Sequence, residues 1–155
     1  MIEVGTAAPD FTAPTDGGGS FTLSEQRGKF VVLYFYPKDS TPGCTVEACN
    51  FRDIHSDITS LNAIVVGVSK DSVRRHDNFV KKQSLNFPLV SDADSDICEK
   101  YGTWVKKKMY GKEYMGIARA TFLVGPDGVV REVWPKVRVK EHSAEVVAAL
   151  RTHTA

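Results

Sequence analysis

The stretch Lys29-Phe-Val-Val-Leu-Tyr-Phe-Tyr36 runs directly into Pro37-Lys-Asp-Ser-Thr-Pro-Gly-Cys44, which places a thiol where a strand gives way to a helix. The first half is an apolar run of β-branched and aromatic side chains, typical of a buried parallel strand. Amide groups at a helix start point toward such a cysteine, and the helix dipole adds partial positive charge. This position favours the thiolate over the thiol, so the sequence predicts a nucleophile at Cys44.

A second apolar run, Ala63 to Ser69, predicts another buried strand. Between the two runs, apolar residues recur at steps of three and four, which predicts a helix from about Gly43 to Leu61. These residues are Phe51, Ile54, Ile58 and Leu61. The segment is therefore expected to form a strand, helix, strand unit.

The following segments continue the alternation. A helix is expected from Asp71 to Gln83, with Asp71 or Ser72 as its cap. A short strand at 87–91 and a short helix at 95–101, ended by Gly102, are expected next.

The carboxy-terminal part predicts an antiparallel addition to the sheet. Two strand-like segments, 120–124 and 129–134, are joined by the turn sequence Gly125-Pro-Asp-Gly128. A closing helix is expected from about Lys140 to Arg151, and Gly17 to Ser20 are interpreted as the turn of an amino-terminal hairpin. The fold class is α/β, with a mixed central sheet flanked by helices and an amino-terminal hairpin extension.

Composition bounds the possible functions. With 155 residues and 42% hydrophobic content, the chain fits a single domain over 1–155. The 20 basic and 19 acidic residues nearly balance, which argues against nucleic acid or an anionic membrane as a partner. The apolar run Phe30 to Pro37 is far shorter than the roughly 20 residues of a membrane helix. Because Met1 to Thr6 lacks the pattern of a secretory signal, we expect a cytosolic protein.

The three cysteines are too few for a disulfide framework. Four residues separate Cys44 from Cys49, which matches neither the thioredoxin active-site spacing nor a zinc knuckle. Cys98, beside Ile97 and Tyr101, is interpreted as a packing residue. The histidines show no metal-site spacing and are expected at the surface, so we expect neither a metal nor a cofactor; they are His55, His76, His142 and His153.

The segment Thr41-Pro-Gly-Cys-Thr-Val-Glu-Ala-Cys49 resembles the peroxiredoxin signature, in the version of the bacterioferritin comigratory protein or PrxQ subgroup. Ala8-Pro-Asp-Phe11, Tyr34-Phe-Tyr-Pro37 and Arg119 to Gly128 carry the resemblance over essentially the whole chain. Each flank alone is weak, but the order and spacing together are specific. The resemblance implies a thioredoxin-like fold.

It also implies a thiol peroxidase that acts on hydrogen peroxide and organic hydroperoxides. Cys44 would be the peroxidatic cysteine, and Cys49 would resolve its sulfenic acid as an intramolecular disulfide that thioredoxin or a similar thiol reductant reduces. Arg119 matches the family arginine and, with Thr41 and Gly43, would bind the peroxide, while Pro37 would shape and shield the pocket. A monomer is expected.

The reaction itself accounts for these residue types. Negative charge develops on the departing peroxide oxygen, and a guanidinium and free backbone amides can stabilise it. Each residue also has a plainer interpretation: Arg119 as a surface residue on an edge strand, Thr41 as a helix cap and Pro37 as a strand terminator. Glu47 is interpreted either as a residue that orients Arg119 or as an exposed helix acid.

The spacing of the two cysteines has a geometric consequence. Residues five apart in an α-helix have Cα atoms about 8 to 9 Å from each other, beyond the roughly 7 Å that a disulfide spans. If Cys44 and Cys49 pair, the first helical turns must unwind in every cycle. A helix-buried apolar role for Cys49 remains the alternative.

Two other functions stay open at this point. One is a thiol-disulfide oxidoreductase on the same fold, and the other is a redox sensor whose oxidation alters its choice of partner. The lysines at 106–108, with Lys112, are expected to form a basic loop. Such a loop is usually only solvated, although it could contact a reductant.

Overall fold

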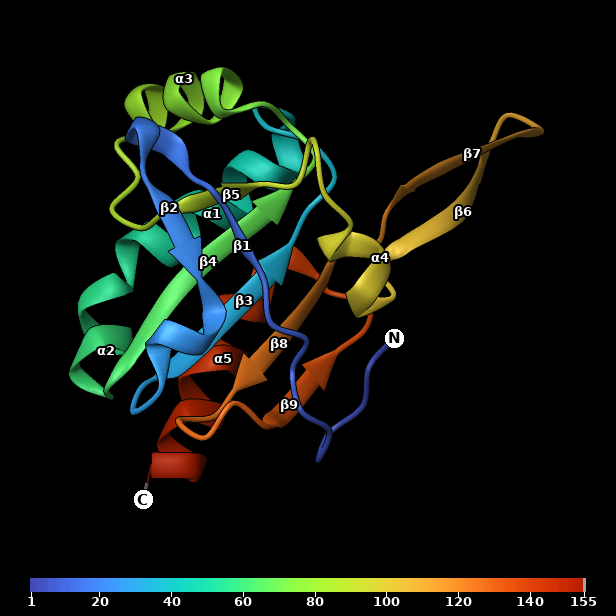
Figure 1. The fold of residues 1–155 in the computed structure, drawn as a ribbon. Helices are drawn as coiled ribbons and strands as arrows, with labels where there is room; N and C mark the ends of the chain where they lie inside the picture. Colours follow the sequence, from blue (N-terminus) through green and yellow to red (C-terminus); the bar gives the residue numbers. More distant parts are fainter. Residues whose placement is uncertain (155) are drawn as a thin grey trace.

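The computed structural model describes residues 1–154 and is built on a five-stranded mixed sheet (Figure 1). The predicted domain ends at residue 155, which lies outside the described residues. The strand order is β5-β4-β3-β8-β9, with β3, β4 and β5 parallel and with β8 antiparallel to both β3 and β9. The strands are β3 (Phe30–Phe35), β4 (Ala63–Ser69), β5 (Leu89–Ser91), β8 (Ala120–Val124) and β9 (Val130–Trp134).

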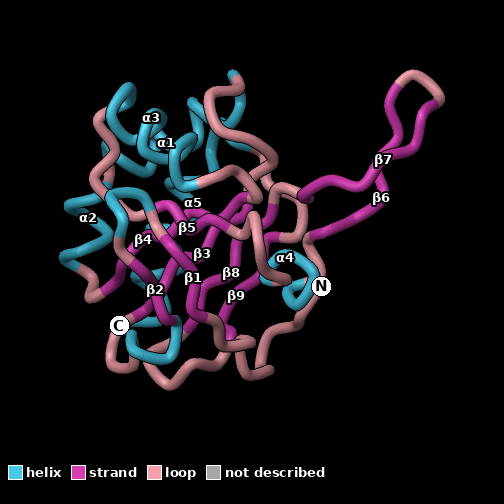
Figure 2. The backbone as a smooth tube through the Cα atoms, turned by 45° about the horizontal axis from the view of Figure 1, so that its top comes forward, coloured by secondary structure: helices cyan, strands magenta, loops and turns pink. Residues whose placement is uncertain are grey.

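Helices and a small hairpin cover the two faces of this sheet (Figure 2). On one face, Phe51, Ile58 and Val146 pack with Val32 of β3 in one buried cluster, which Phe79 joins. These side chains come from α1 (Pro42–Asp53), α2 (His55–Ser60), α5 (Val139–Thr154) and α3 (Val73–Gln83).

The other face carries a second buried cluster, which includes Phe11, Phe21 and Tyr101. It is covered by α4 (Ile97–Tyr101) and by the hairpin of β1 (Thr12–Pro14) and β2 (Ser20–Thr22), with the 3-10 turns η1 (Asp16–Gly18) and η2 (Leu23–Gln26). The predicted α/β fold and the amino-terminal hairpin are confirmed. Among the described residues, no helix combines the length and apolar content that a membrane crossing requires.

One predicted helix is divided in two. The helix expected over 43–61 is interrupted at Ile54, whose φ of −105° and ψ of 12° separate α1 from α2. Neither glycine nor proline lies at the break, so the apolar periodicity continues through it without a signal. For α3, Ser72 is the cap, and its side chain accepts a hydrogen bond from the Arg75 amide.

The prediction that the lysines at 106–108 and Lys112 form a basic loop is wrong, because they lie in a β-hairpin. Strands β6 (Trp104–Met109) and β7 (Lys112–Ile117) pair antiparallel and project from the body as an arm (Figures 1 and 2). Tyr110 and Gly111 form its two-residue turn with φ of 52° and 78°, and positive φ at both central positions is characteristic of a type I′ turn. The loop was predicted from the run of lysines alone, without recognition of Tyr110 and Gly111 as a hairpin turn.

Candidate active site

Cys44 lies in the first turn of α1, behind the loop that leaves β3. Pro42 opens the helix and Thr41 precedes it in an extended conformation, which suits a proline whose fixed φ fits the first helical position. The Thr41 hydroxyl donates to the Lys38 carbonyl at 2.8 Å, so it stabilises the loop and not the helix end. The alternative interpretation of Thr41 as a residue whose side chain caps the helix is therefore wrong. Cys44 lies at this helix start with only 2% of its surface exposed.

Arg119 reaches the cysteine from the other side of the site. Its Nη2 donates to the Cys44 sulfur at 3.3 Å, while its Nη1 donates to Glu47 Oε1 at 2.6 Å. Arg119 lies immediately before β8 and not inside it, and its side chain is only 20% exposed. Glu47 is 1% exposed, so the exposed-acid interpretation of this residue is wrong. The structure brings the three groups together in one hydrogen-bonded chain.

Burial and neighbouring charges have opposite effects on the pKa values of Glu47 and Arg119. Burial raises the pKa of Glu47 to about 7, although the Arg119 guanidinium acts to lower it. For Arg119, burial lowers the pKa, but Glu47 and Cys44 outweigh burial and raise it. Arg119 therefore stays a cation, held by a carboxylate whose second oxygen, Oε2, has no hydrogen-bond partner in the described structure.

Gly43 leaves room for this cation. A Cβ atom at this position would lie 3.3 Å from Arg119 Nη2, closer than ordinary van der Waals contact. Any side chain here would press the guanidinium away from its present position. Gly43 also lines a cavity of about 500 Å³ with Val46 of α1 and Val139 of α5.

Pro37 lies on the other side of the loop and is half-buried. It lines a separate cavity of about 370 Å³ with Trp104, Met115 and Ile117 from the arm and its base. The lining is mainly apolar and also includes three lysines, Lys38, Lys70 and Lys107. The arm therefore forms one wall of the space beside the active-site loop.

His76, which the sequence placed among the expected surface histidines, is buried and holds the same loop. His76 is 0% exposed and its Nδ1 lies 2.6 Å from Asp39 Oδ2, while its Nε2 lies 3.0 Å from the Val90 carbonyl. Both neighbours accept hydrogen bonds, so both ring nitrogens are suited to donate. Burial lowers the pKa of His76, but Asp39 and the Val90 carbonyl outweigh burial and raise it. A buried ion pair thus ties the loop at Asp39 to α3.

The loop has further partners around Asp39. The Tyr36 hydroxyl donates to Asp39 Oδ1, and the Asp39 amide donates to Asp71 Oδ2 at 2.8 Å. Asp39, Asp71 and His76 bring three potential metal ligands within 4.8 Å of one another. These atoms already bond to each other and to Ser69 and Tyr36, which explains the cluster without an ion.

His142 also contradicts the surface expectation, since it is 1% exposed. Its Nε2 lies 2.7 Å from the Thr121 hydroxyl, and burial lowers its pKa despite the nearby Glu145 carboxylate. His55 and His153 are partly buried. The sequence contained no signal for either buried histidine, because histidine pairing depends on contacts between distant segments.

The other two cysteines differ in their surroundings. Cys49 is half-buried in the same helix as Cys44, and its sulfur lies 3.6 Å from Gln83 Oε1 of α3. Cys98 is fully buried and donates its backbone amide to Asp92 Oδ2 at 2.9 Å. Burial, followed by the hydrogen bond with Asp92 and the negative charge of Asp92, raises the pKa of the Cys98 thiol far above its usual value. This agrees with the packing interpretation of Cys98.

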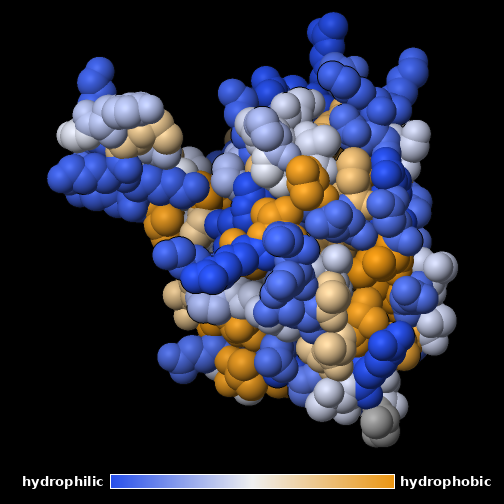
Figure 3. Space-filling view, turned by 180° about the vertical axis from the view of Figure 1, so that it is seen from behind, coloured by the Kyte–Doolittle hydropathy of each residue, from blue (hydrophilic) through white to orange (hydrophobic). Residues whose placement is uncertain are grey.

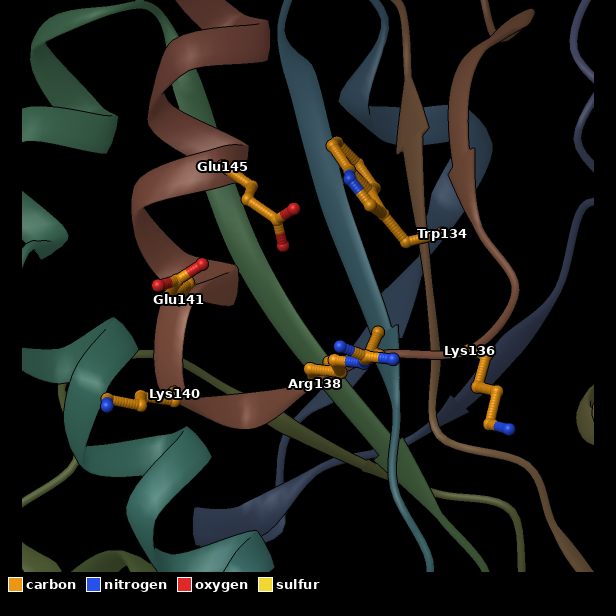
Figure 4. Close-up of a pocket in the computed structure, with 7 residues that line it drawn as sticks. Trp134, Lys136, Arg138, Lys140, Glu141 and Glu145 are labelled. Atoms are coloured by element: carbon orange, nitrogen blue, oxygen red, sulfur yellow. The ribbon is translucent and has the colours of Figure 1, made fainter.

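A third cavity, of about 420 Å³, lies between β9 and the start of α5 (Figure 4). Trp134 and Glu145 extend into it from opposite sides, and Lys136, Arg138 and Glu141 also line it. None of the site residues predicted from the sequence belongs to this cavity.

Comparison with known proteins agrees with this geometry. The AhpC/TSA family matches residues 4–133. A Coxiella burnetii protein assigned to the Bcp peroxiredoxins is 54% identical over 149 residues, covering 96% of this chain and 99% of its own. Peroxiredoxin Bcp of Bacillus subtilis is 47% identical over 97% of this chain and 96% of its own.

The solved structure of the Xanthomonas campestris bacterioferritin comigratory protein is similar as well. It superposes with a TM-score of 0.92 at 43% identity and covers 100% of this chain and 99% of its own. Similarity of this extent includes the loop, the helix start and the strand that follows Arg119. The chain therefore belongs to the AhpC/TSA family and, within it, to the Bcp group of peroxiredoxins.

Proposed function

We propose that this protein is a thiol peroxidase in which Cys44 reduces hydrogen peroxide and organic hydroperoxides. The observation that carries the proposal is the position of Arg119, which contacts the Cys44 sulfur and is held by the buried Glu47. The X. campestris relative is described in connection with alkyl peroxide reduction activity, which supports the same substrate class.

In the proposed reaction the Cys44 thiolate attacks one peroxide oxygen and the O–O bond breaks. The sulfur becomes a sulfenic acid, and the departing oxygen leaves as an alkoxide or hydroxide that takes a proton to give alcohol or water. The Arg119 guanidinium lies close enough to stabilise the thiolate before attack and the negative oxygen afterwards.

Thr41, Pro37 and Gly43 are proposed to shape the peroxide site. Thr41 and Gly43 flank Pro42 at the helix start, and both lie within three residues of Cys44 along the chain. Pro37 shields the loop from the side of the arm. Because the Thr41 hydroxyl donates to Lys38, its lone pairs remain available to accept a hydrogen bond from a peroxide.

Cys49 is proposed to resolve the sulfenic acid by forming a disulfide with Cys44, with release of water. Both residues lie in the continuous helix α1, where their Cα atoms would be about 8 to 9 Å apart. Disulfide formation then requires the first turns of α1 to unwind and the Cys49 contact with Gln83 to break. The disulfide is intramolecular, so a monomer suffices.

A thioredoxin-like thiol reductant is proposed to return both cysteines to the thiol form. A reductant of this kind belongs to a reducing compartment, which is consistent with a cytosolic location. Neither the attack nor the resolution step needs a metal or an organic cofactor, since sulfur supplies both electrons.

Three preparations test this function: wild type, Cys44→Ser and Cys49→Ser, assayed for peroxide-dependent NADPH consumption with thioredoxin and its reductase. Cys44→Ser is expected to lose all activity, while Cys49→Ser consumes one equivalent of peroxide without thioredoxin-supported turnover. Full turnover by Cys44→Ser would refute the proposal. Turnover with disulfide substrates but not with peroxide would identify a thiol-disulfide oxidoreductase instead.

A further inference from the structure

The β6–β7 arm carries a positive charge that the rest of the chain does not share. Between Trp104 and Ile117 it contains four lysines and one acid, Glu113, whereas the whole chain has 20 basic and 19 acidic residues. Without these five residues, 16 basic and 18 acidic residues remain, so the body is slightly acidic. The charge balance of the whole chain, which argues against an anionic membrane as a partner, averages over these two unlike parts. An anionic surface is therefore attracted to the arm and not to the body.

The arm also exposes apolar and aromatic side chains. Seven large side chains of this kind are exposed in the described structure, and four of them lie in the arm: Met109, Tyr110, Tyr114 and Met115. Tyr110, in the turn, is 98% exposed. Figure 3 shows the arm standing away from the body, with hydrophilic and weakly apolar side chains next to each other along it. Exposed apolar side chains gathered in one place indicate an interaction surface.

The pairing register distributes both kinds of side chain over both faces of the arm. Three cross-strand pairs join a lysine to an apolar or aromatic residue. They are Lys106 with Met115, Lys107 with Tyr114, and Lys112 with Met109. Opposed residues of antiparallel strands share a face, and successive residues alternate between faces. Each face therefore mixes cations with apolar groups, and neither is an apolar face on which another protein could pack.

This mixture fits the headgroup region of an anionic lipid bilayer. In that region apolar and aromatic side chains reach the edge of the acyl chains, while lysine ammonium groups stay among the lipid phosphates. The end of the arm has this composition, because Met109 and Tyr110 lie between Lys108 and Lys112. A protein surface would meet one face of the arm, whereas a layer of lipid headgroups surrounds its end on all sides.

We propose that the β6–β7 arm binds anionic lipid bilayers, with Met109 and Tyr110 inserted among the headgroups and Lys108 and Lys112 bound to lipid phosphates. Each strand has six residues and is about 20 Å long, so the end of the arm reaches the bilayer before the acidic body does. The base of the arm lines the cavity beside Pro37, so binding holds the active-site loop close to the membrane surface. The inference does not rest on the proposed peroxidase function, since lipid binding requires no reaction at Cys44.

Flotation of the full chain with vesicles tests this inference. The vesicles contain phosphatidylcholine alone or phosphatidylcholine and phosphatidylglycerol in equal parts, at low and at high salt. Lys108→Gln with Lys112→Gln removes two charges from the arm. Lys81→Gln with Lys82→Gln is the matched control, because it removes two exposed lysines from α3 of the body. Tyr110→Asn removes the aromatic ring and suits the turn, since asparagine before glycine is preferred in a type I′ turn.

Wild type is expected to float with the anionic vesicles at low salt and not with phosphatidylcholine alone. Each lost arm lysine should lower the partition coefficient about fivefold, so the Lys108, Lys112 double variant should lose about 25-fold. Tyr110→Asn should lower it roughly threefold, because part of the ring no longer leaves water. The Lys81, Lys82 double variant should bind as wild type does.

A fluorescent reporter at the end of the arm tests insertion itself. The emission of Tyr110→Trp should shift to the blue and be quenched by brominated lipids in anionic vesicles only, with wild type as the baseline for Trp104 and Trp134. Absence of this shift would overturn the inference, as would failure of wild type to float with anionic vesicles at low salt. An equal loss of binding in the Lys81, Lys82 double variant would also overturn it. Binding of a single-stranded oligonucleotide without vesicle binding would assign the arm to nucleic acid instead.

Discussion

Arg119 Nη1 lies 2.6 Å from Glu47 Oε1, so the cation that contacts the Cys44 sulfur is itself held by a buried carboxylate on the same helix as that sulfur. Glu47 follows Cys44 by three residues, which places both side chains on one side of α1. Helix α1 thus carries both the proposed nucleophile and the carboxylate that holds Arg119 beside it. Unwinding of α1 would disturb both at once.

Arg119→Lys is expected to lower the second-order rate constant for peroxide by about 100-fold, since one ammonium cannot donate to sulfur and carboxylate in the same fork geometry. Glu47→Gln, which keeps an acceptor for Arg119 but removes the charge, should have a smaller effect, about 10-fold. Stopped-flow measurement of the first peroxide turnover checks both. A larger loss of this rate constant in Glu47→Gln than in Arg119→Lys would contradict the proposal that Arg119 acts on the reacting groups and that Glu47 only holds Arg119.

The raised pKa of Glu47 makes part of the stability depend on pH. The folded-state value of about 7 exceeds the ordinary value of 4.5, so the folded protein binds this proton more tightly than the unfolded chain does. The contribution is fully present below about pH 4.5 and is lost as pH rises through 7, with a total on the order of 3 kcal/mol.

Urea unfolding of wild type and Glu47→Gln at several pH values between 4.5 and 8 measures this contribution. Wild type should lose stability relative to Glu47→Gln as pH rises, and all other titratable side chains are common to both proteins. A difference that stays constant with pH would show that Glu47 does not titrate there.

The buried pair of His76 and Asp39 gives a prediction about the active-site loop. His76→Ala should destabilise the protein by about 3 to 5 kcal/mol, because it leaves the Asp39 carboxylate buried without its partner. Asp39→Asn with His76→Ala should lose less than the sum of the two single changes.

The pKa of His76 is raised by its partners, so its contribution is fully present below its unfolded value of about 6.5 and is lost as pH rises through the folded value. Chemical unfolding of the single and double variants across this range measures both effects. Additive changes would show that the pair is not coupled.

The proposed disulfide should unfold the start of α1. Hydrogen exchange of amides 43 to 50 is expected to be slow in the reduced protein and fast after one equivalent of peroxide, while β3 and β4 keep their protection. Cys49→Ser treated with the same peroxide serves as the control, because it cannot form this disulfide. Equal protection of residues 43 to 50 in reduced and oxidised wild type would argue against the unwinding.

Substitution of Gly67 in β4 tests how tightly the core around this strand is packed. A Cβ atom there would lie 2.8 Å from Leu89 Cδ2 and 2.9 Å from Tyr34 Cζ, both in the buried core. Gly67→Ala should therefore destabilise the protein by about 1 to 3 kcal/mol. Val46→Ala, at a position that is half exposed, should change stability far less. Thermal unfolding compares the two, and similar shifts would contradict this account.

Much of the fold could be predicted because apolar periodicity is a local property. The runs at 29–36 and 63–69 became the central parallel strands, and the turn at 125–128 became the β8–β9 connection. The arm was missed because its strands are largely exposed and lack a regular apolar pattern. The break at Ile54 had no glycine or proline to mark it.

The sequence by itself determined the fold class, the position of Cys44 at a helix start and the membership of the Bcp group, because each depends on residue order within short segments. Only the tertiary structure decided that Glu47 holds Arg119, that His76 is buried against Asp39, and that the β6–β7 arm lines the cavity beside Pro37. The two side-chain pairs join residues 72 and 37 positions apart, and the arm is brought to the loop from a distant part of the chain. Charge and burial at such positions are set by packing between distant segments, which no local pattern encodes.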